Sequence, residues 1–209
     1  MTYSIFNTLR DQIFAMDEGT VFTLQDLGMD VPYTSIRRIL SDLSQDGYIQ
    51  RITNGVYRAV NKHSALARTP SATKDILSAI MRDNSWVIYP GTEMARRILG
   101  LSYDASLPEL YFSSGRSYTY KLEIGGTLRL RYCGGKFMTS PAVTERTALV
   151  TIALMDLYAH PITAEELAHL SNTLNKEEKL DLIKALPYIP ARLRPVFEII
   201  CGTYGPGGR

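Results

Sequence analysis

The chain has 209 residues, of which 45% are hydrophobic and 21% charged, and its formal net charge is +2. These proportions are ordinary for a globular protein and exclude the disordered and fibrous classes. No run approaches the roughly 20 apolar residues of a membrane-spanning helix, and the first residues lack a signal-peptide pattern. We therefore expect a cytoplasmic protein with no membrane partner, in which Cys133 and Cys201 form neither a disulfide nor a zinc site.

The charge is unevenly distributed along the chain. Residues 1–60 hold five Arg against seven acidic residues, residues 61–140 hold eleven basic against six acidic residues, and the remainder is close to neutral. A basic middle segment favours an anionic partner, whereas a mildly acidic N-terminal segment is unusual for a domain that binds phosphates.

The first sixty residues follow the element order of a winged helix. Apolar residues recur every three or four positions over residues 3–16, which predicts a first helix. Residues 21–22 read as a short extended piece, and Thr23 as the N-cap of a brief helix that ends at Gly28. Pro32 forces an extended link, so we expect the next helix to begin at residue 33 or 34.

A tight hairpin is predicted directly after that helix. Asn54-Gly55 separates two short alternating runs at residues 48–52 and 56–59, which favours a type I′ turn between two strands. Helix and hairpin together are typical of a recognition helix and its wing. The expected fold is α+β, with an N-terminal winged helix-turn-helix domain at residues 1–60.

The polar face of the predicted recognition helix changes character along its length. Its second half carries Asp42 and Asp46, whereas its first half is hydroxylic and basic, as expected of a helix that offers DNA its N-terminal end. Exposed arginines can also be merely solvated. The candidate DNA-binding residues are Thr34, Ser35, Arg37, Arg38 and Ser41 on the helix, and Arg51, Asn54 and Arg58 on the wing.

A polar linker at residues 61–69 separates this domain from a second, mixed α/β domain at residues 70–204 that ends in helices. We expect a helix from Pro70, a strand at 86–89, a short helix at 93–100 that Thr92 caps and Gly100 ends, and strands at 110–113, 118–124 and 128–132. The last two strands alternate strictly, so one face is apolar and the other basic. An ordinary solvated face and an accessory nucleic-acid or partner surface both remain open for the basic residues Arg116, Lys121, Arg129 and Arg131.

The C-terminal third is predicted to be helical. Residues 142–158 are strongly apolar at helical spacing, and two capping boxes start the following helices, Thr163 with Glu166 and Asn175 with Glu178. Residues 190–201 form a last helix in which Pro195 bends the helix or delays its start. The glycine-rich tail is expected to be disordered.

Catalytic and metal-binding motifs are not found in the sequence. The histidines His63, His160 and His169 are scattered, and no P-loop, nucleophile elbow or zinc-protease motif occurs. Acidic pairs near residues 165 and 177 are better explained as first-turn acids of helices. We therefore expect neither an enzyme nor a cofactor.

Residues 87–133 resemble the core of the AbiEi-type antitoxins of type IV toxin-antitoxin systems. The phrase that carries the resemblance is Gly91, Ala95, Leu99, Gly100 and Leu101, followed by Leu107-Pro108 and the basic hairpin; residues 55–57 and 181–200 are also similar to the family. Many members have a more basic wing.

The resemblance implies a DNA-binding transcriptional repressor that binds repeats in its own promoter, often cooperatively or as a homodimer. It also implies an antitoxin that counteracts a cognate nucleotidyltransferase toxin without forming a stable complex. The alternative is a protein-interaction module whose winged helix does not bind DNA and whose basic hairpin docks an acidic partner.

Overall fold

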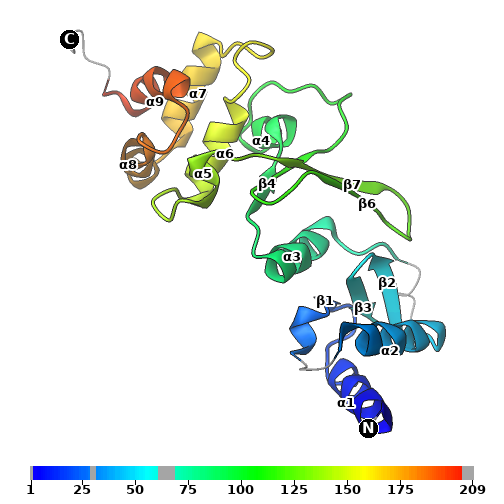
Figure 1. Cartoon of the computed structure of the whole chain (residues 1–209). Helices are drawn as coiled ribbons and strands as arrows, with labels where there is room; N and C mark the ends of the chain where they lie inside the picture. The colour runs from blue at the N-terminus through cyan, green and yellow to red at the C-terminus, as the bar shows by residue number, and fades with distance from the viewer. Residues whose placement is uncertain (1, 29–31, 61–68, 204–209) are drawn as a thin grey trace. The chain divides into compact units, whose positions relative to one another are not determined.

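The computed structural model describes residues 2–28, 32–60 and 69–203 (Figure 1). The chain divides into two compact units, one made of residues 1–86 and 119–128, the other of residues 87–118 and 129–209. The first unit therefore extends beyond the boundary predicted at residue 60. Most of the predicted linker and the predicted disordered tail lie outside the described residues.

The first unit is a winged helix, as predicted. Its elements are α1 (Thr2–Phe14), β1 (Val21–Thr23), the 3-10 turn η1 (Gln25–Leu27), α2 (Tyr33–Gln45), β2 (Ile49–Thr53), β3 (Val56–Ala59) and α3 (Thr73–Asn84). The strands form an antiparallel sheet in the order β1-β3-β2. Apolar side chains of α1, α2 and the sheet form one core, in which Leu9, Leu40 and Leu43 are completely buried.

Two local predictions in this unit were wrong. Thr23 is the last residue of β1 and does not cap η1; its N–H instead donates to Asp26 at 2.8 Å. The hairpin turn is not type I′, because that turn needs two residues with positive φ and Gly55 has φ 77° whereas Asn54 does not. The register of the hairpin also shifts between Arg51 and Thr53, as it does at a β-bulge or a similar irregularity.

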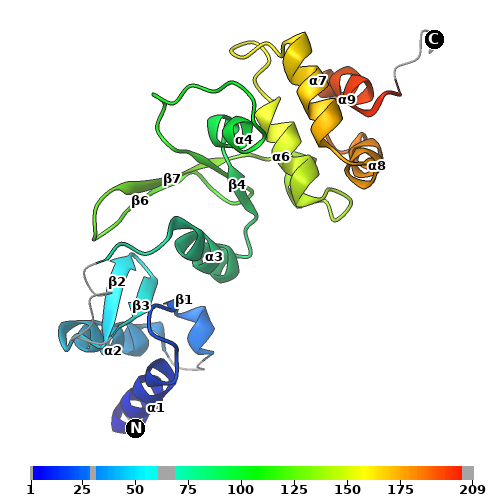
Figure 2. The same ribbon diagram turned by 180° about the vertical axis from the view of Figure 1, so that it is seen from behind.

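The helix α3 packs on the sheet of the first unit. It lies against β1 and β3 on the side away from α2 (Figures 1 and 2), with Ile76, Ala79 and Ile80 buried. Arg82 of α3 forms an ion pair with Asp26 at 3.0 Å, and its Nη2 donates to the carbonyl of Val21. Both faces of this small sheet are therefore covered. The helix begins at Thr73, later than the predicted start at Pro70.

The second unit combines a sheet with a helical bundle, which completes the predicted α+β fold. It contains β4 (Ile88–Pro90), α4 (Thr92–Ile98), β5 (Tyr111–Ser113) and most of β7 (Thr127–Tyr132). The sheet has the strand order β4-β5-β7-β6, in which β6 spans Tyr118–Lys121. β4 is antiparallel to β5, and β5 is parallel to β7. Residues 119–128, which include most of β6, the hairpin turn and the start of β7, belong to the first unit, where the Glu123 N–H donates to the Ile52 carbonyl at 2.9 Å.

The bundle is built around one buried helix. Its members are α5 (Lys136–Thr139), α6 (Glu145–Ala153), α7 (Ala164–Thr173), α8 (Lys176–Ala185), the 3-10 turn η3 (Ala191–Leu193) and α9 (Arg194–Cys201). The segment 147–153 of α6 is wholly buried, with α4 and α8 packed against it. In the described part of the chain, every helix is too short or too polar to cross a bilayer.

Helix starts in this unit partly follow the predictions. Both capping boxes are present, at Thr163 and at Asn175. Pro195 lies in the first turn of α9 and delays the start of that helix. Proline has no backbone N–H, and it is tolerated in the first turn because residues there have no helical carbonyl to donate to. The helix predicted at 142–158 is shorter and begins after Thr144, and Gly91 rather than Thr92 is the N-cap of α4.

Candidate nucleic-acid interface

The N-terminal half of α2 presents a polar face to solvent. Ile36, Ile39, Leu40 and Leu43 are at most 6% exposed and hold the helix against the core. The side chains between them point outward, as the sequence predicted: Thr34, Arg37, Arg38 and Ser41 are exposed and Ser35 is half-buried. The five candidate residues of this helix therefore share one accessible surface.

The two arginines of this surface are not engaged by the rest of the unit. Within the described residues, Arg37 and Arg38 take part in no ion pair or hydrogen bond, although Asp42 follows Arg38 by one helical turn. Arg38, Thr34 and Asp42 line a surface hollow of about 510 Å³ whose other wall includes Phe6 of α1. Unengaged guanidinium groups of this kind can donate bidentate hydrogen bonds to phosphate or to a guanine edge.

The wing, which is the β2–β3 hairpin, is less available than predicted. Arg51 is half-buried; it donates to the side chain of Asn54 and lies 3.8 Å from Glu123. Asn54 itself is exposed at the tip. Arg51 would have to give up these contacts before its guanidinium could bind a phosphate.

Arg58 does not lie on the wing surface, so its predicted exposure to DNA was wrong. It is 3% exposed and donates to Gln50 on the neighbouring strand. Its strand is the central one of the sheet, and α3 packs against that strand. Burial lowers the pKa of the Arg58 guanidinium from its ordinary value. This residue contributes to the interior of the unit.

The basic residues of the β6–β7 region are all exposed, and the hairpin has the predicted apolar face. Tyr120, Leu128 and Leu130 are buried on that face. The exposed set comprises Arg116, whose guanidinium lies 5.1 Å from the centre of the Tyr118 ring, together with Lys121, Arg129 and Arg131.

The residues that carry the resemblance in the second unit have packing roles. The Gly91 N–H donates a hydrogen bond to the Leu110 carbonyl oxygen, and a Cβ added to Gly91 would lie only 2.6 Å from that same oxygen. Gly100 has φ 71°, a left-handed backbone conformation that is strained for residues with a side chain. Ala95 and Leu99 are buried in the core. The residues that carry the resemblance therefore allow α4 to pack closely against its neighbouring segments.

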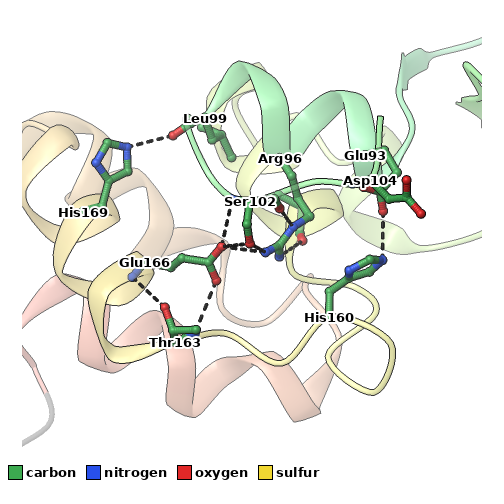
Figure 3. Close-up of polar contacts among 10 residues, drawn as sticks. Glu93, Arg96, Leu99, Ser102, Asp104, His160, Thr163, Glu166 and His169 are labelled. Atoms are coloured by element: carbon green, nitrogen blue, oxygen red, sulfur yellow. Dashed lines mark hydrogen bonds and ion pairs between the residues drawn. The ribbon is translucent and has the colours of Figure 1, made fainter. Parts of the chain in front are cut away.

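The second unit contains a buried polar cluster, and the sequence did not predict that its residues come together. Arg96 of α4, Ser102 and Glu166 of α7 point toward one another (Figure 3), with Arg96 only 1% exposed. Glu166 was recognised as a capping residue, but the charge pattern of α4 does not reveal that Arg96, rather than its neighbour Arg97, is the one that faces inward.

The histidines His160 and His169 have separate partners. His160 lies 2.9 Å from Glu93, and His169 contacts the Leu99 carbonyl at 3.0 Å (Figure 3). His63 lies outside the described residues. Over residues 2–28, 32–60 and 69–203, no three His, Cys, Asp or Glu side chains gather in a way that could hold a metal ion.

Comparison with known proteins identifies one family. The model described as "Family of unknown function (DUF6088)" matches residues 8–182, most of the chain. No curated protein and no solved structure matches the sequence.

Proposed function

The chain belongs to the DUF6088 family, whose description assigns no function, and from its own geometry we propose that it binds double-stranded DNA through α2. One observation carries the proposal: the first half of α2 exposes Arg37 and Arg38, both unengaged within the described residues, on a helix whose other face is buried. Major-groove recognition by winged helices uses a helix presented in this way.

The proposed contacts are divided between helix and wing. Arg37 or Arg38 reads guanine through two hydrogen bonds, a contact worth about 1 to 3 kcal/mol of discrimination between bases. Thr34, Ser35 and Ser41 supply hydroxyl groups for phosphates or base edges. From the wing, Asn54 contributes at the tip and Arg51 only after leaving Glu123.

The biological role that we propose is autorepression combined with antitoxin activity. Its support is the resemblance of residues 87–133 to AbiEi-type antitoxins. On this proposal the protein binds repeats in its own promoter, as a homodimer or cooperatively, and counteracts a nucleotidyltransferase toxin without forming a stable complex with it.

A mobility-shift assay on the upstream region of the gene tests DNA binding. The assay compares the full chain with the Arg37→Ala/Arg38→Ala variant, in a salt series and with a scrambled competitor. The Lys74→Ala variant is a control, because Lys74 is exposed on α3 in the same unit. Specific retardation that the double variant loses and Lys74→Ala retains supports the proposal; no retardation even at low salt overturns it.

One observation favours a second candidate, an interaction module without DNA binding. Residues 1–60 carry a net charge of −2, and Arg58 is buried, so this part of the first unit offers phosphates little positive charge. In that case the basic β6–β7 hairpin docks an acidic partner. Recovery of a stoichiometric complex with the neighbouring gene product, in the absence of a mobility shift, would select this function.

A further inference from the structure

The second unit contains a cavity that neither DNA binding nor autorepression uses. Its volume is about 560 Å³, within the range of about 300 to 1,000 Å³ that small-molecule sites occupy. Apolar side chains, among them Met94, Leu107 and Phe112, form much of its wall. All lining residues belong to the second unit, so the site does not depend on α2.

Two arginines of the cavity wall come from one strand. Arg129 and Arg131 stand two residues apart on β7, so their side chains project from the same face of the strand. Both are exposed, and neither takes part in an ion pair or hydrogen bond within the described part of the chain. A third arginine of the wall, Arg97, already lies 3.7 Å from Glu109.

Two carboxylates of the cavity wall are held in position by local hydrogen bonds. Oδ1 of Asp104 accepts from the N–H and hydroxyl of Ser106, and Oδ1 of Asp156 accepts from the N–H of Ala159. Glu93 is engaged by His160, and Figure 3 shows these two side chains beside Asp104. Oδ2 of Asp104 and Oδ2 of Asp156 accept no hydrogen bond within the described residues.

A cavity whose wall carries unengaged guanidinium groups, unengaged carboxylate oxygens and apolar side chains is complementary to a small zwitterion. We propose that this cavity binds a peptide-like zwitterion, with its carboxylate on Arg129 and Arg131 and its ammonium group on Asp104 and Asp156. A guanidinium pairs with a carboxylate through two parallel hydrogen bonds, and an ammonium group supplies three donors.

Capped and uncapped probes test the arginine pair and the aspartate pair separately. Saturation-transfer NMR on the full chain first screens unmodified dipeptides with an apolar second residue, single apolar amino acids and AMP; dissociation constants follow by titration. The best dipeptide is then compared with its N-acetylated form, which lacks the cation, and its C-amidated form, which lacks the anion. Each cap should weaken binding by about tenfold, the size expected for losing a charge-assisted hydrogen bond.

Variants assign the two ends of the ligand. Arg129→Gln/Arg131→Gln should weaken the dipeptide and make C-amidation inconsequential, whereas Asp104→Asn/Asp156→Asn should do the same for N-acetylation. Arg194→Gln is the matched control, because Arg194 is exposed in the same unit and does not line the cavity. Circular dichroism of each variant confirms that it is folded.

Each outcome decides the proposal. Binding that both caps weaken, with the two variants acting on opposite ends, supports it, and the comparison of dipeptides with amino acids identifies the length of the zwitterion. No binding by any dipeptide or amino acid, binding that the caps leave unchanged, or tighter binding of AMP than of any zwitterion would overturn it. A loss in Arg194→Gln equal to that in the β7 variant would also overturn it, by showing a non-specific ionic effect.

Discussion

The guanidinium of Arg96 donates through Nη2 to Oε1 of Glu166 at 2.7 Å, which joins α4 to the first turn of α7. The same carboxylate oxygen accepts from the N–H and hydroxyl of Ser102, while Oε2 closes the capping box on Thr163. Arg96 also donates to the Ala153 carbonyl at the end of α6. One arginine therefore connects three helices through hydrogen bonds whose acceptors are buried or half-buried.

Replacing Arg96 by methionine should strongly destabilise the protein. Removing one partner of a buried ion pair leaves the other charge uncompensated, at a cost of about 3 to 5 kcal/mol. Arg97→Met is the matched control on the same helix, because Arg97 is half-exposed and its pair with Glu109 is of a kind worth about 0 to 1 kcal/mol. Urea denaturation of the two variants measures the difference; equal losses would contradict the role of Arg96.

Stability of the second unit should fall in acid because of Glu166. Desolvation by burial raises the pKa of Glu166, but hydrogen bonds from Ser102 and Thr163 and the charge on Arg96 outweigh it, so the pKa is lowered from 4.5. A lowered pKa in the folded state means that the stabilisation is present above pH 4.5 and is lost as the pH falls through the folded-state pKa.

Thermal unfolding of the wild type and of Glu166→Gln between pH 7 and pH 3 measures this effect. The wild type should lose more stability over the acid part of the range, so the two curves converge as the pH falls. Asp26, whose pKa is also lowered by its pairing with Arg82 despite an opposing effect of burial, titrates in the first unit of both proteins and serves as an internal reference. If the stability curves of the two proteins ran parallel with pH, groups other than Glu166 would be responsible for the acid sensitivity.

Features that depend on neighbouring residues were predictable from the sequence. The capping boxes at Thr163 and Asn175 need only a side chain and a carboxylate three positions later. The stripe of apolar residues in α2 and the alternation in β7 have the periods of a half-buried helix and strand. The winged-helix order and the outward side of α2 follow from such local patterns.

Features that depend on distant segments were not predictable in the same way. The partner of buried Arg96 is Glu166, which lies seventy positions further along the chain. Nothing in the sequence around Arg96 indicates that pairing. Arg58 lies in a strand that alternates as a wing should, yet α3 covers it. Whether a long charged side chain is buried or exposed cannot be predicted until the element that packs over it is known.

Gly91→Ala should destabilise the second unit. The added Cβ would lie 2.6 Å from the backbone oxygen of Leu110, so a chain segment has to shift, and overpacking of this kind costs about 1 to 3 kcal/mol. Gly134→Ala is the control, since the new Cβ there meets the far end of the exposed Tyr132 side chain, which can rotate away. Differential scanning fluorimetry compares the two; a stable Gly91→Ala protein would show that the segments separate easily.

Arg38→Ala should weaken binding to the operator more than binding to unrelated DNA. A base contact contributes only where the right base is present, whereas a phosphate contact contributes everywhere. Competition titrations at one salt concentration give the ratio of the two affinities, which should fall by the equivalent of about 1 to 3 kcal/mol. An equal loss on both DNAs would reassign Arg38 to the phosphate backbone.

Arg58→Met should alter stability while leaving DNA binding intact, the reverse of what Arg37→Ala should do. The side chain of Arg58 is enclosed between the strands and α3, so its replacement disturbs packing and the hydrogen bond to Gln50, with an expected change of about 0.5 to 3 kcal/mol. Arg37 is exposed and has no partner among the described residues, so its loss should cost little stability. Urea denaturation and operator binding, measured on both variants at a temperature where each is folded, separate the two roles. If Arg58→Met reduced operator affinity as much as Arg37→Ala at unchanged stability, the strand would have to open on DNA, and the wing would regain the role that its sequence pattern predicted.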